Sequence, residues 1–394
     1  MPATSAGVTA GGRPDLAKTM ENFSLLGGPL QEFGARAGLV RSRTDTVALG
    51  VALGWSSWLV LVTLAVAKGG AGDLFSLGAV AIHARLLVAI PLLFVAETAL
   101  DAKLREFVAL LVRSEIFDAK ALAGFEAAVA RLSAWQKSIA PDAASLVAAV
   151  ALSLFAGGLS TEIEPGRALS AAPWAGAWFN YFCLPLFRFL LFRWAWRLLL
   201  WWALLWRLAG TALDLSPAHP DRAGGLGYLE TVHTRFAPLV FAVSVCVAAA
   251  FAEELALGET TLAEVLPALV TTLVVDCLLF LAPLCLFLFK FRNCREKGLR
   301  EYALLSSRYV HAFERKWMGG ASEGDGLLGI PDIQSLADLA NSVEGVRKMR
   351  LAPISLQLVA TLGVAAALPM LPLLLFDQPA VELAKLLFKK LAGL

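Results

Sequence analysis

Long apolar stretches, separated by shorter polar ones, run along this 394-residue chain. An α-helix rises about 1.5 Å per residue, so roughly 20 apolar residues cross the hydrocarbon layer of a bilayer, which is about 30 Å thick. Seven stretches approach or exceed that length, at residues 47–67, 81–100, 143–159, 174–208, 237–255, 266–291 and 354–376. The pattern predicts an all-α fold, a multi-pass helical membrane protein with about seven transmembrane helices.

Two glycines four residues apart, Gly50 and Gly54, lie in the first stretch. Neither has a side chain, so another helix can approach closely at this point. The same spacing is common by chance in stretches rich in glycine and alanine. We therefore predict a close helix contact here and give a dimer interface less weight.

Lysine and arginine are concentrated in alternate loops. They precede the first stretch and follow the second and sixth, whereas the intervening loops contain few. Basic loops remain in the cytoplasm, so we expect the N-terminus and three long loops there, and a location in the inner membrane. The predicted organisation is a cytoplasmic N-terminal tail at 1–44, a transmembrane domain at 45–376 with cytoplasmic helical insertions at 101–140, 208–236 and 292–352, and a short amphipathic C-terminal tail at 377–394.

The basic loops themselves have a helical pattern. Apolar residues recur every three or four positions in 118–137, 298–317 and 331–349, as on one face of a helix. The glycine-rich segment 319–329 between the last two predicts a flexible linker. We expect a helical cytoplasmic layer in which these faces pack against each other.

Composition agrees with a membrane protein and excludes several functions. Hydrophobic residues make up 58% of the chain and charged residues 17%, against about 25% charged in soluble proteins. The formal net charge of +2 gives no support for binding nucleic acid. The five cysteines form no CxxC pair and the four histidines are scattered, so neither a zinc site nor paired haem ligands are predicted. No hydrolase or metalloprotease motif occurs, so we expect no catalytic residues, no metal and no cofactor, and the protein is not predicted to be an enzyme.

Charged residues inside the apolar stretches are the main candidates for a functional site. Arg188, Arg193 and Arg197 lie in the fourth stretch, Glu97 in the second and Asp276 in the sixth. An arginine near the bilayer centre costs about 2.5–3.5 kcal/mol on insertion scales, so each requires a partner, water or headgroups. Helix rise places Arg188 and Asp276 at equal depth, which predicts a buried pair. It also allows Glu97 to pair with Arg193 or Arg197.

Helical angle separates the three arginines. At about 100° per residue, Arg193 and Arg197 are about 40° apart on one face, and Arg188 is on nearly the opposite side. Two interpretations follow. Either the charges form structural salt bridges, with the lower arginines extending to headgroups, or Arg193 and Arg197 line a permeation pathway. His83 and Arg85 are interpreted as the boundary of the second stretch.

The loop at 214–230, DLSPAHPDRAGGLGYLE, follows the fourth stretch. Its prolines prevent a continuous helix, and Gly224 and Gly225 permit tight backbone turns. His219 and Asp221 are expected to bind a cation or each other. The main interpretation is a rigid turn that joins two crossings.

The functional prediction is an ion-conducting pathway, an anion-favouring channel formed by a homo-oligomer. Arginines in a membrane helix and basic charge at its cytoplasmic end favour anions. Membrane lipids and small inorganic ions are the expected partners. One alternative is a secondary transporter that uses Asp276 and Arg188 as a coupled site. Another is a non-conducting scaffold or sensor whose cytoplasmic helices recruit a partner.

Overall fold

A computed structural model describes residues 29–36, 38, 46–67, 69–159, 169, 172–318, 331–376 and 389. Every regular element in this part of the chain is a helix and none is a strand, which confirms the all-α prediction. Six helices are long and apolar enough to cross a membrane. A seventh crossing is obtained if α7 (Ala119–Lys137) and α8 (Ile139–Leu159), which are bent by 49° relative to each other, form one span.

All seven predicted stretches correspond to helices in the structure, several of them longer than expected. The first is α3 (Val47–Ala67), and the third is α8. The others are built from joined segments. The second stretch consists of η1 (Leu77–Ala79), α5 (Val80–His83), η2 (Ala84–Ala89) and α6 (Ile90–Arg113), and the fourth of α9 (Pro173–Trp178), η4 (Phe179–Cys183) and α10 (Leu184–Gly210). The fifth consists of α11 (Tyr228–Thr234) and α12 (Ala237–Leu257), and the sixth of α13 (Leu262–Leu281), η5 (Ala282–Phe287) and α14 (Leu288–Trp317). The seventh consists of α16 (Leu356–Ala367) and η6 (Leu368–Phe376).

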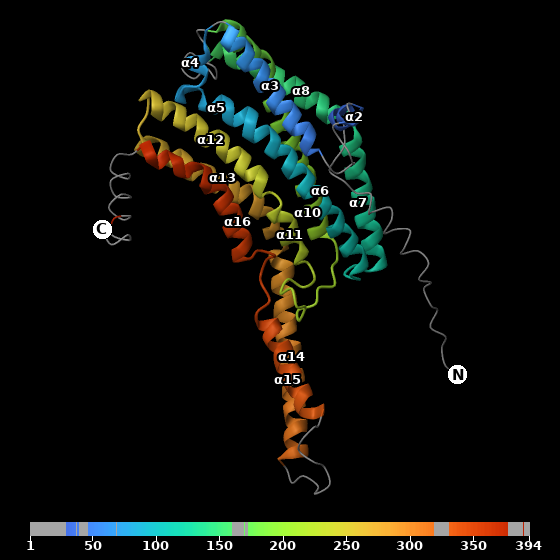
Figure 1. The fold of residues 1–394 in the computed structure, drawn as a ribbon. Coiled ribbons are helices and arrows are strands. Elements are labelled where there is room, and N and C mark those ends of the chain that lie inside the picture. Colours follow the sequence, from blue (N-terminus) through green and yellow to red (C-terminus); the bar gives the residue numbers. More distant parts are fainter. Residues whose placement is uncertain are drawn as a thin grey trace.

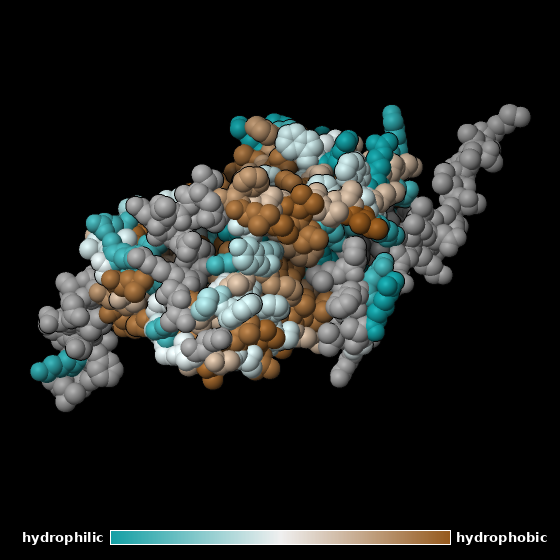
Figure 2. Space-filling view, turned by 90° about the horizontal axis from the view of Figure 1, so that it is seen from above, coloured by the Kyte–Doolittle hydropathy of each residue, from teal (hydrophilic) through white to brown (hydrophobic). Residues whose placement is uncertain are grey.

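The crossings pack side by side in a bundle (Figure 1). Helix α6 lies between α3 and α12, α10 packs on α8 and α7, and α16 packs on α12 and α13. Large apolar side chains on the outside of the bundle are exposed, as expected for surfaces that face lipid: Leu59, Val147, Val274 and Leu278. Figure 2 looks onto the bundle from the top of Figure 1, and shows apolar residues over its middle and hydrophilic residues towards its margins.

Helix α14 continues out of the bundle and forms a projecting hairpin with α15 (Pro331–Arg347) (Figure 1). We call this side of the bundle the hairpin end. Lys316 and Asp332 form an ion pair of 2.6 Å near the tip, and the Tyr309 hydroxyl donates to the Asp332 carbonyl. The predicted packing of these two helices on each other is confirmed. Helix α7 instead packs on α10, with Phe125 and Val129 buried.

Parts of the predicted organisation lie outside the described residues. The linker at 319–329 and almost all of the C-terminal tail at 377–394 are among them, as is most of the N-terminal tail at 1–44. Within that N-terminal tail, a short helix α2 (Pro29–Arg36) is described. The short helix α4 (Ala71–Leu74) lies in the loop after the first crossing.

Two crossings contain a widened, π-helical turn beside a proline. Segment η2 precedes Pro91, and segment η4 precedes Pro185. Proline has no N–H to donate, and its ring displaces the carbonyl of the preceding turn, which favours a wider turn. Single π-helical turns are found disproportionately at functional sites. Arg85 lies inside η2, and Arg188 lies three residues after Pro185.

The glycine pair in the first crossing makes a contact within the chain. A Cβ atom at Gly50 would lie 2.6 Å from the Phe94 ring, and one at Gly54 would overlap the carbonyl oxygen of Leu86. Helix α3 therefore approaches η2 and α6 at a distance that only glycine permits. The predicted close contact is confirmed, and its partner is the second crossing of the same chain.

Candidate functional site

Four charged side chains from three helices form a buried ion cluster. The Arg197 guanidinium lies 2.6 Å from a Glu97 carboxylate oxygen, and the Arg193 guanidinium lies 3.7 Å from the same oxygen. Arg193 also lies 3.6 Å from a carboxylate oxygen of Asp142, in the first turn of α8. The predicted pairing of Glu97 with Arg193 or Arg197 is confirmed, and the cluster connects α6, α8 and α10.

The cluster is closed and its formal charges balance. The side chains of Glu97, Arg193 and Arg197 are only 3–4% exposed and that of Asp142 is 16% exposed, and the two carboxylates pair with the two guanidiniums. A neutral, buried cluster favours the structural interpretation, because ions in a pathway need access to the charges that attract them. The lining of a pathway by Arg193 and Arg197 remains a prediction. Asp142 escaped the sequence analysis because it lies one residue before the predicted third stretch.

The predicted pair between Arg188 and Asp276 is wrong. The Arg188 guanidinium donates to the Ser153 hydroxyl of α8 at 2.8 Å, and Asp276 accepts from the Ser244 hydroxyl of α12 at 3.5 Å. Depth alone suggested the pair, but α10 packs on α8 and α7, whereas α13 packs on α12 and α16. The two residues face different neighbours.

A second arginine accompanies Arg188. Arg85 in η2 carries the same charge as Arg188, so the two repel each other, whereas Glu253 of α12 attracts Arg85. Among the described residues, no carboxylate lies within ion-pair distance of Arg85 or Arg188. The side chains of Arg85 and Arg188 are each partly exposed. Arg85 and Arg188 therefore add two positive charges to the bundle, and Glu253 partly offsets that of Arg85.

Arg85 was missed as a site residue because it was interpreted as the boundary of its stretch. The second crossing in fact begins at Leu77, eight residues earlier, which places Arg85 about 12 Å inside it. The proline at position 91 was the available signal. It marks the widened turn in which Arg85 lies.

The loop after α10 is held by the carboxylate of Asp221. This carboxylate accepts hydrogen bonds from the backbone N–H groups of Ala223, Gly225 and Gly227 at 2.7–3.2 Å, and it lies 2.8 Å from a ring nitrogen of His219. Of the two expectations for His219 and Asp221, binding to each other is the one the structure confirms. The backbone of the loop thus folds around the carboxylate of Asp221.

A second set of contacts fixes this loop to the start of the last crossing. Arg350 forms an ion pair of 2.6 Å with Glu230, and it donates to the carbonyls of Asp221 and Arg222. The hydroxyl of Ser355 also donates to Glu230. Gly224 and Gly225 have φ angles of 63° and 97°, which residues other than glycine rarely adopt. These contacts support the prediction of a rigid turn.

Replacing Asp221 should loosen this loop. Burial alone would raise the pKa of Asp221, but the hydrogen bonds from Ala223, Gly227 and Gly225 outweigh it and hold the pKa below its usual value. The carboxylate therefore stabilises the fold at neutral pH, and the contribution is lost as the pH falls through the lowered folded-state pKa. We expect Asp221→Ala to cost about 1–2 kcal/mol at pH 7, as for a lost helix N-cap.

Thermal unfolding in detergent at pH 7 and in acid measures this effect. The difference between wild type and Asp221→Ala should shrink in acid. His219→Ala, which removes one half-exposed partner, should change stability by less than about 1 kcal/mol. Equal stability of wild type and Asp221→Ala at pH 7 would contradict the assigned role.

In the described part of the chain, no group of three or more His, Cys, Asp and Glu side chains is placed to hold a metal ion. Apart from Asp276, the candidate residues thus form three separate sets: the ion cluster around Glu97, the two arginines Arg85 and Arg188, and the loop around Asp221. Comparison with known proteins adds no relative, since no family model, no curated protein and no solved structure matches this chain.

Proposed function

We propose that this multi-pass membrane protein provides a pathway for small anions, and that Arg85 and Arg188 bind the anion inside the membrane. The observation that supports the proposal is that the positive charges of Arg85 and Arg188 act on each other across two crossings, with no carboxylate within ion-pair distance of either among the described residues. We further propose, from the lysine and arginine asymmetry, that the hairpin end faces the cytoplasm.

The physical argument concerns the cost of like charges in a poor solvent. Arginine remains protonated across physiological pH, so neither group relieves the repulsion by losing its proton. A small anion between the two guanidiniums replaces repulsion with two attractions, which are strong where water is scarce. Glu253 lies near the C-terminal end of α12, and its negative charge weakens the positive potential around Arg85. The weaker potential there permits release of the anion.

The scaffold alternative has one observation in its favour. The α14–α15 hairpin exposes large apolar side chains away from the bundle, with Leu304 and Leu305 more than half exposed. Apolar surface on a projecting hairpin is a common feature of protein contacts. The transporter alternative loses its basis, because Asp276 and Arg188 do not form a coupled site.

Chloride flux in proteoliposomes tests the proposal. Wild-type protein should conduct chloride, and Arg188→Gln should reduce the flux about tenfold or more, because a hydrogen bond to a charged group contributes about 1.5–3 kcal/mol. Arg292→Gln is the matched control, since Arg292 pairs only with Glu296 on the exposed surface of α14, and it should leave the flux unchanged.

Two outcomes would reject the pathway. Wild-type protein that passes no ions would leave the scaffold function in its place. Equal flux through the Arg188→Gln and Arg292→Gln variants would show that the arginine pair has no part in conduction.

A further inference from the structure

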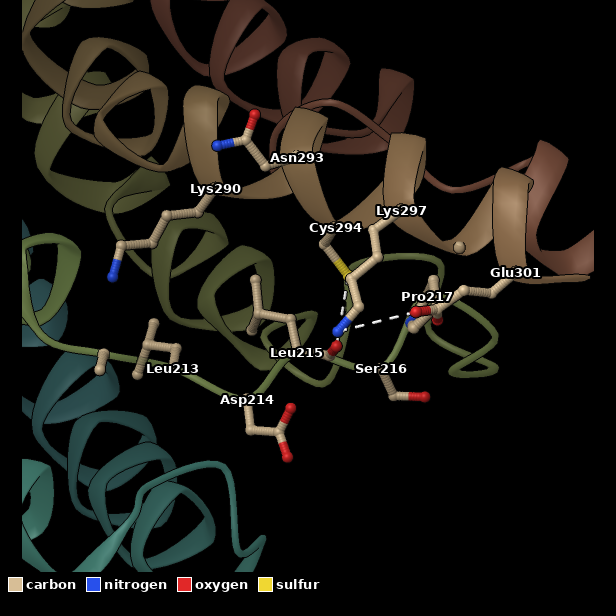
Figure 3. A pocket seen from close by; sticks show the side chains of 12 residues that line it. Leu213, Asp214, Leu215, Ser216, Pro217, Lys290, Asn293, Cys294, Lys297 and Glu301 are labelled. Carbon is tan, nitrogen blue, oxygen red and sulfur yellow. Dashed lines mark hydrogen bonds and ion pairs between the residues drawn. The ribbon is translucent and has the colours of Figure 1, made fainter.

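A polar recess lies at the hairpin end, between α14 and the loop that follows α10 (Figure 3). Its volume is about 650 Å³. Lys290 and Lys297 line it from α14, and Asp214 and Ser216 line it from the loop, where their side chains point away from α14 (Figure 3). The lining of the recess therefore contains ammonium groups from α14, and a carboxylate and a hydroxyl from the loop.

The walls of the recess are fixed to each other. The Lys290 ammonium donates to the carbonyl of Thr211, the residue that ends α10. One turn further along α14, the thiol of Cys294 donates to the carbonyl of Leu215 at 3.2 Å. Gly298 permits the ring of Pro217 to lie directly against the helix, where a Cβ atom would approach it to 2.5 Å. The recess is thus preformed.

An apolar groove of about 280 Å³ lies between α10 and η5, the segments that precede the two walls of the recess along the chain. It is lined by Trp202, Ala203, Trp206, Ala282, Pro283 and Leu286. Leu286 is one helical turn before Lys290, so the groove leads towards the recess. Trp206 is 68% exposed, so the groove opens towards lipid, and tryptophan is typical of the interface between hydrocarbon and headgroups.

We propose that this surface binds one phospholipid with a zwitterionic, ethanolamine-type headgroup. One acyl chain lies in the apolar groove, and Lys290 and Lys297 hold the phosphate. Asp214 and Glu301 hold the ammonium group. Two cationic and two anionic side chains line the recess, and they include the exposed pair of Lys297 and Glu301 at 3.9 Å. This lining matches a headgroup that contains one charge of each sign better than a purely anionic one.

Native mass spectrometry of the purified full-length protein tests the site with three probes: phosphatidylethanolamine, phosphatidylglycerol and inorganic phosphate. Wild-type protein should retain one phosphatidylethanolamine in preference to phosphatidylglycerol. The double variant Lys290→Gln with Lys297→Gln should retain it about tenfold less, since each lysine near a lipid surface contributes substantially to binding. Lys120→Gln, an exposed lysine at the start of α7, is the control and should match wild type.

A second variant tests the groove separately from the headgroup site. Ala203 is exposed and lines the groove, so Ala203→Phe fills it without entering the protein core. This variant should also lose the lipid. Retention of inorganic phosphate by Ala203→Phe together with no lipid retention by wild type would assign the recess to a free phosphate compound and overturn the lipid proposal. Preference for phosphatidylglycerol, or equal retention by the lysine variants and the control, would overturn it as well.

Discussion

Glu97→Ala is expected to destabilise the protein by about 3–5 kcal/mol, the usual cost of removing one partner from a buried ion pair. Glu97 is the acid nearest to Arg197 and also lies 3.7 Å from Arg193. Without Glu97, Asp142 is the one carboxylate of the cluster that remains to balance two guanidiniums, which are nearly inaccessible to water. The stranded charge has no route to solvent, so the loss should appear as a lower unfolding temperature and reduced expression.

Thermal unfolding in detergent measures this loss of stability. Two further variants serve as a control and as a test of coupling. Glu106→Ala is the control, because the pair of Glu106 with Lys103 is exposed to solvent and its loss should change stability little. Adding Arg197→Met to Glu97→Ala removes the stranded charge and should recover part of the loss. Strictly additive losses in the double variant would contradict a coupled pair.

Gly225→Val is the other substitution with a large expected effect. Gly225 has a φ angle of 97°, a conformation that costs a β-branched residue about 1–3 kcal/mol. A Cβ atom there would also lie 3.0 Å from the end of the Ile116 side chain, so Ile116 must move. Because Asp221 receives the N–H of Gly225, a shift of this backbone also weakens the contacts that hold the loop.

The measurement is again thermal unfolding, with Gly72→Val as the matched control. Gly72 does not have a positive φ angle, and a Cβ atom there would meet nothing within 4 Å. Gly72→Val should therefore have little effect, whereas Gly225→Val should lower the unfolding temperature clearly. A Gly225→Val protein as stable as the control would mean that the loop is not a rigid turn.

Hydropathy predicts the crossings of this chain well, because a bilayer imposes both helix length and apolar composition. The seven stretches correspond to helices, and depth along those helices correctly suggested that Glu97 meets Arg193 or Arg197. The pairing of Glu97 succeeds because α6 and α10 are also neighbours in the bundle.

Depth cannot show which helices are neighbours, and for that reason the proposed pair of Arg188 with Asp276 failed. Boundaries caused the other two omissions. Asp142 lies just before a predicted stretch and Arg85 at the edge of another, yet both lie inside helices that begin earlier than hydropathy indicates. Residues at predicted boundaries in such a chain should therefore be examined as partners of buried charges.

The reversal potential under a potassium chloride gradient tests the proposed anion pathway most directly. Positive charge at Arg85 and Arg188 should attract chloride and repel potassium, so the wild-type reversal potential should lie near the equilibrium potential of chloride. Reversing both charges, with Arg85→Glu and Arg188→Glu, should shift it towards the equilibrium potential of potassium. A wild-type reversal potential near that of potassium, or one that the double variant leaves unchanged, would contradict the account.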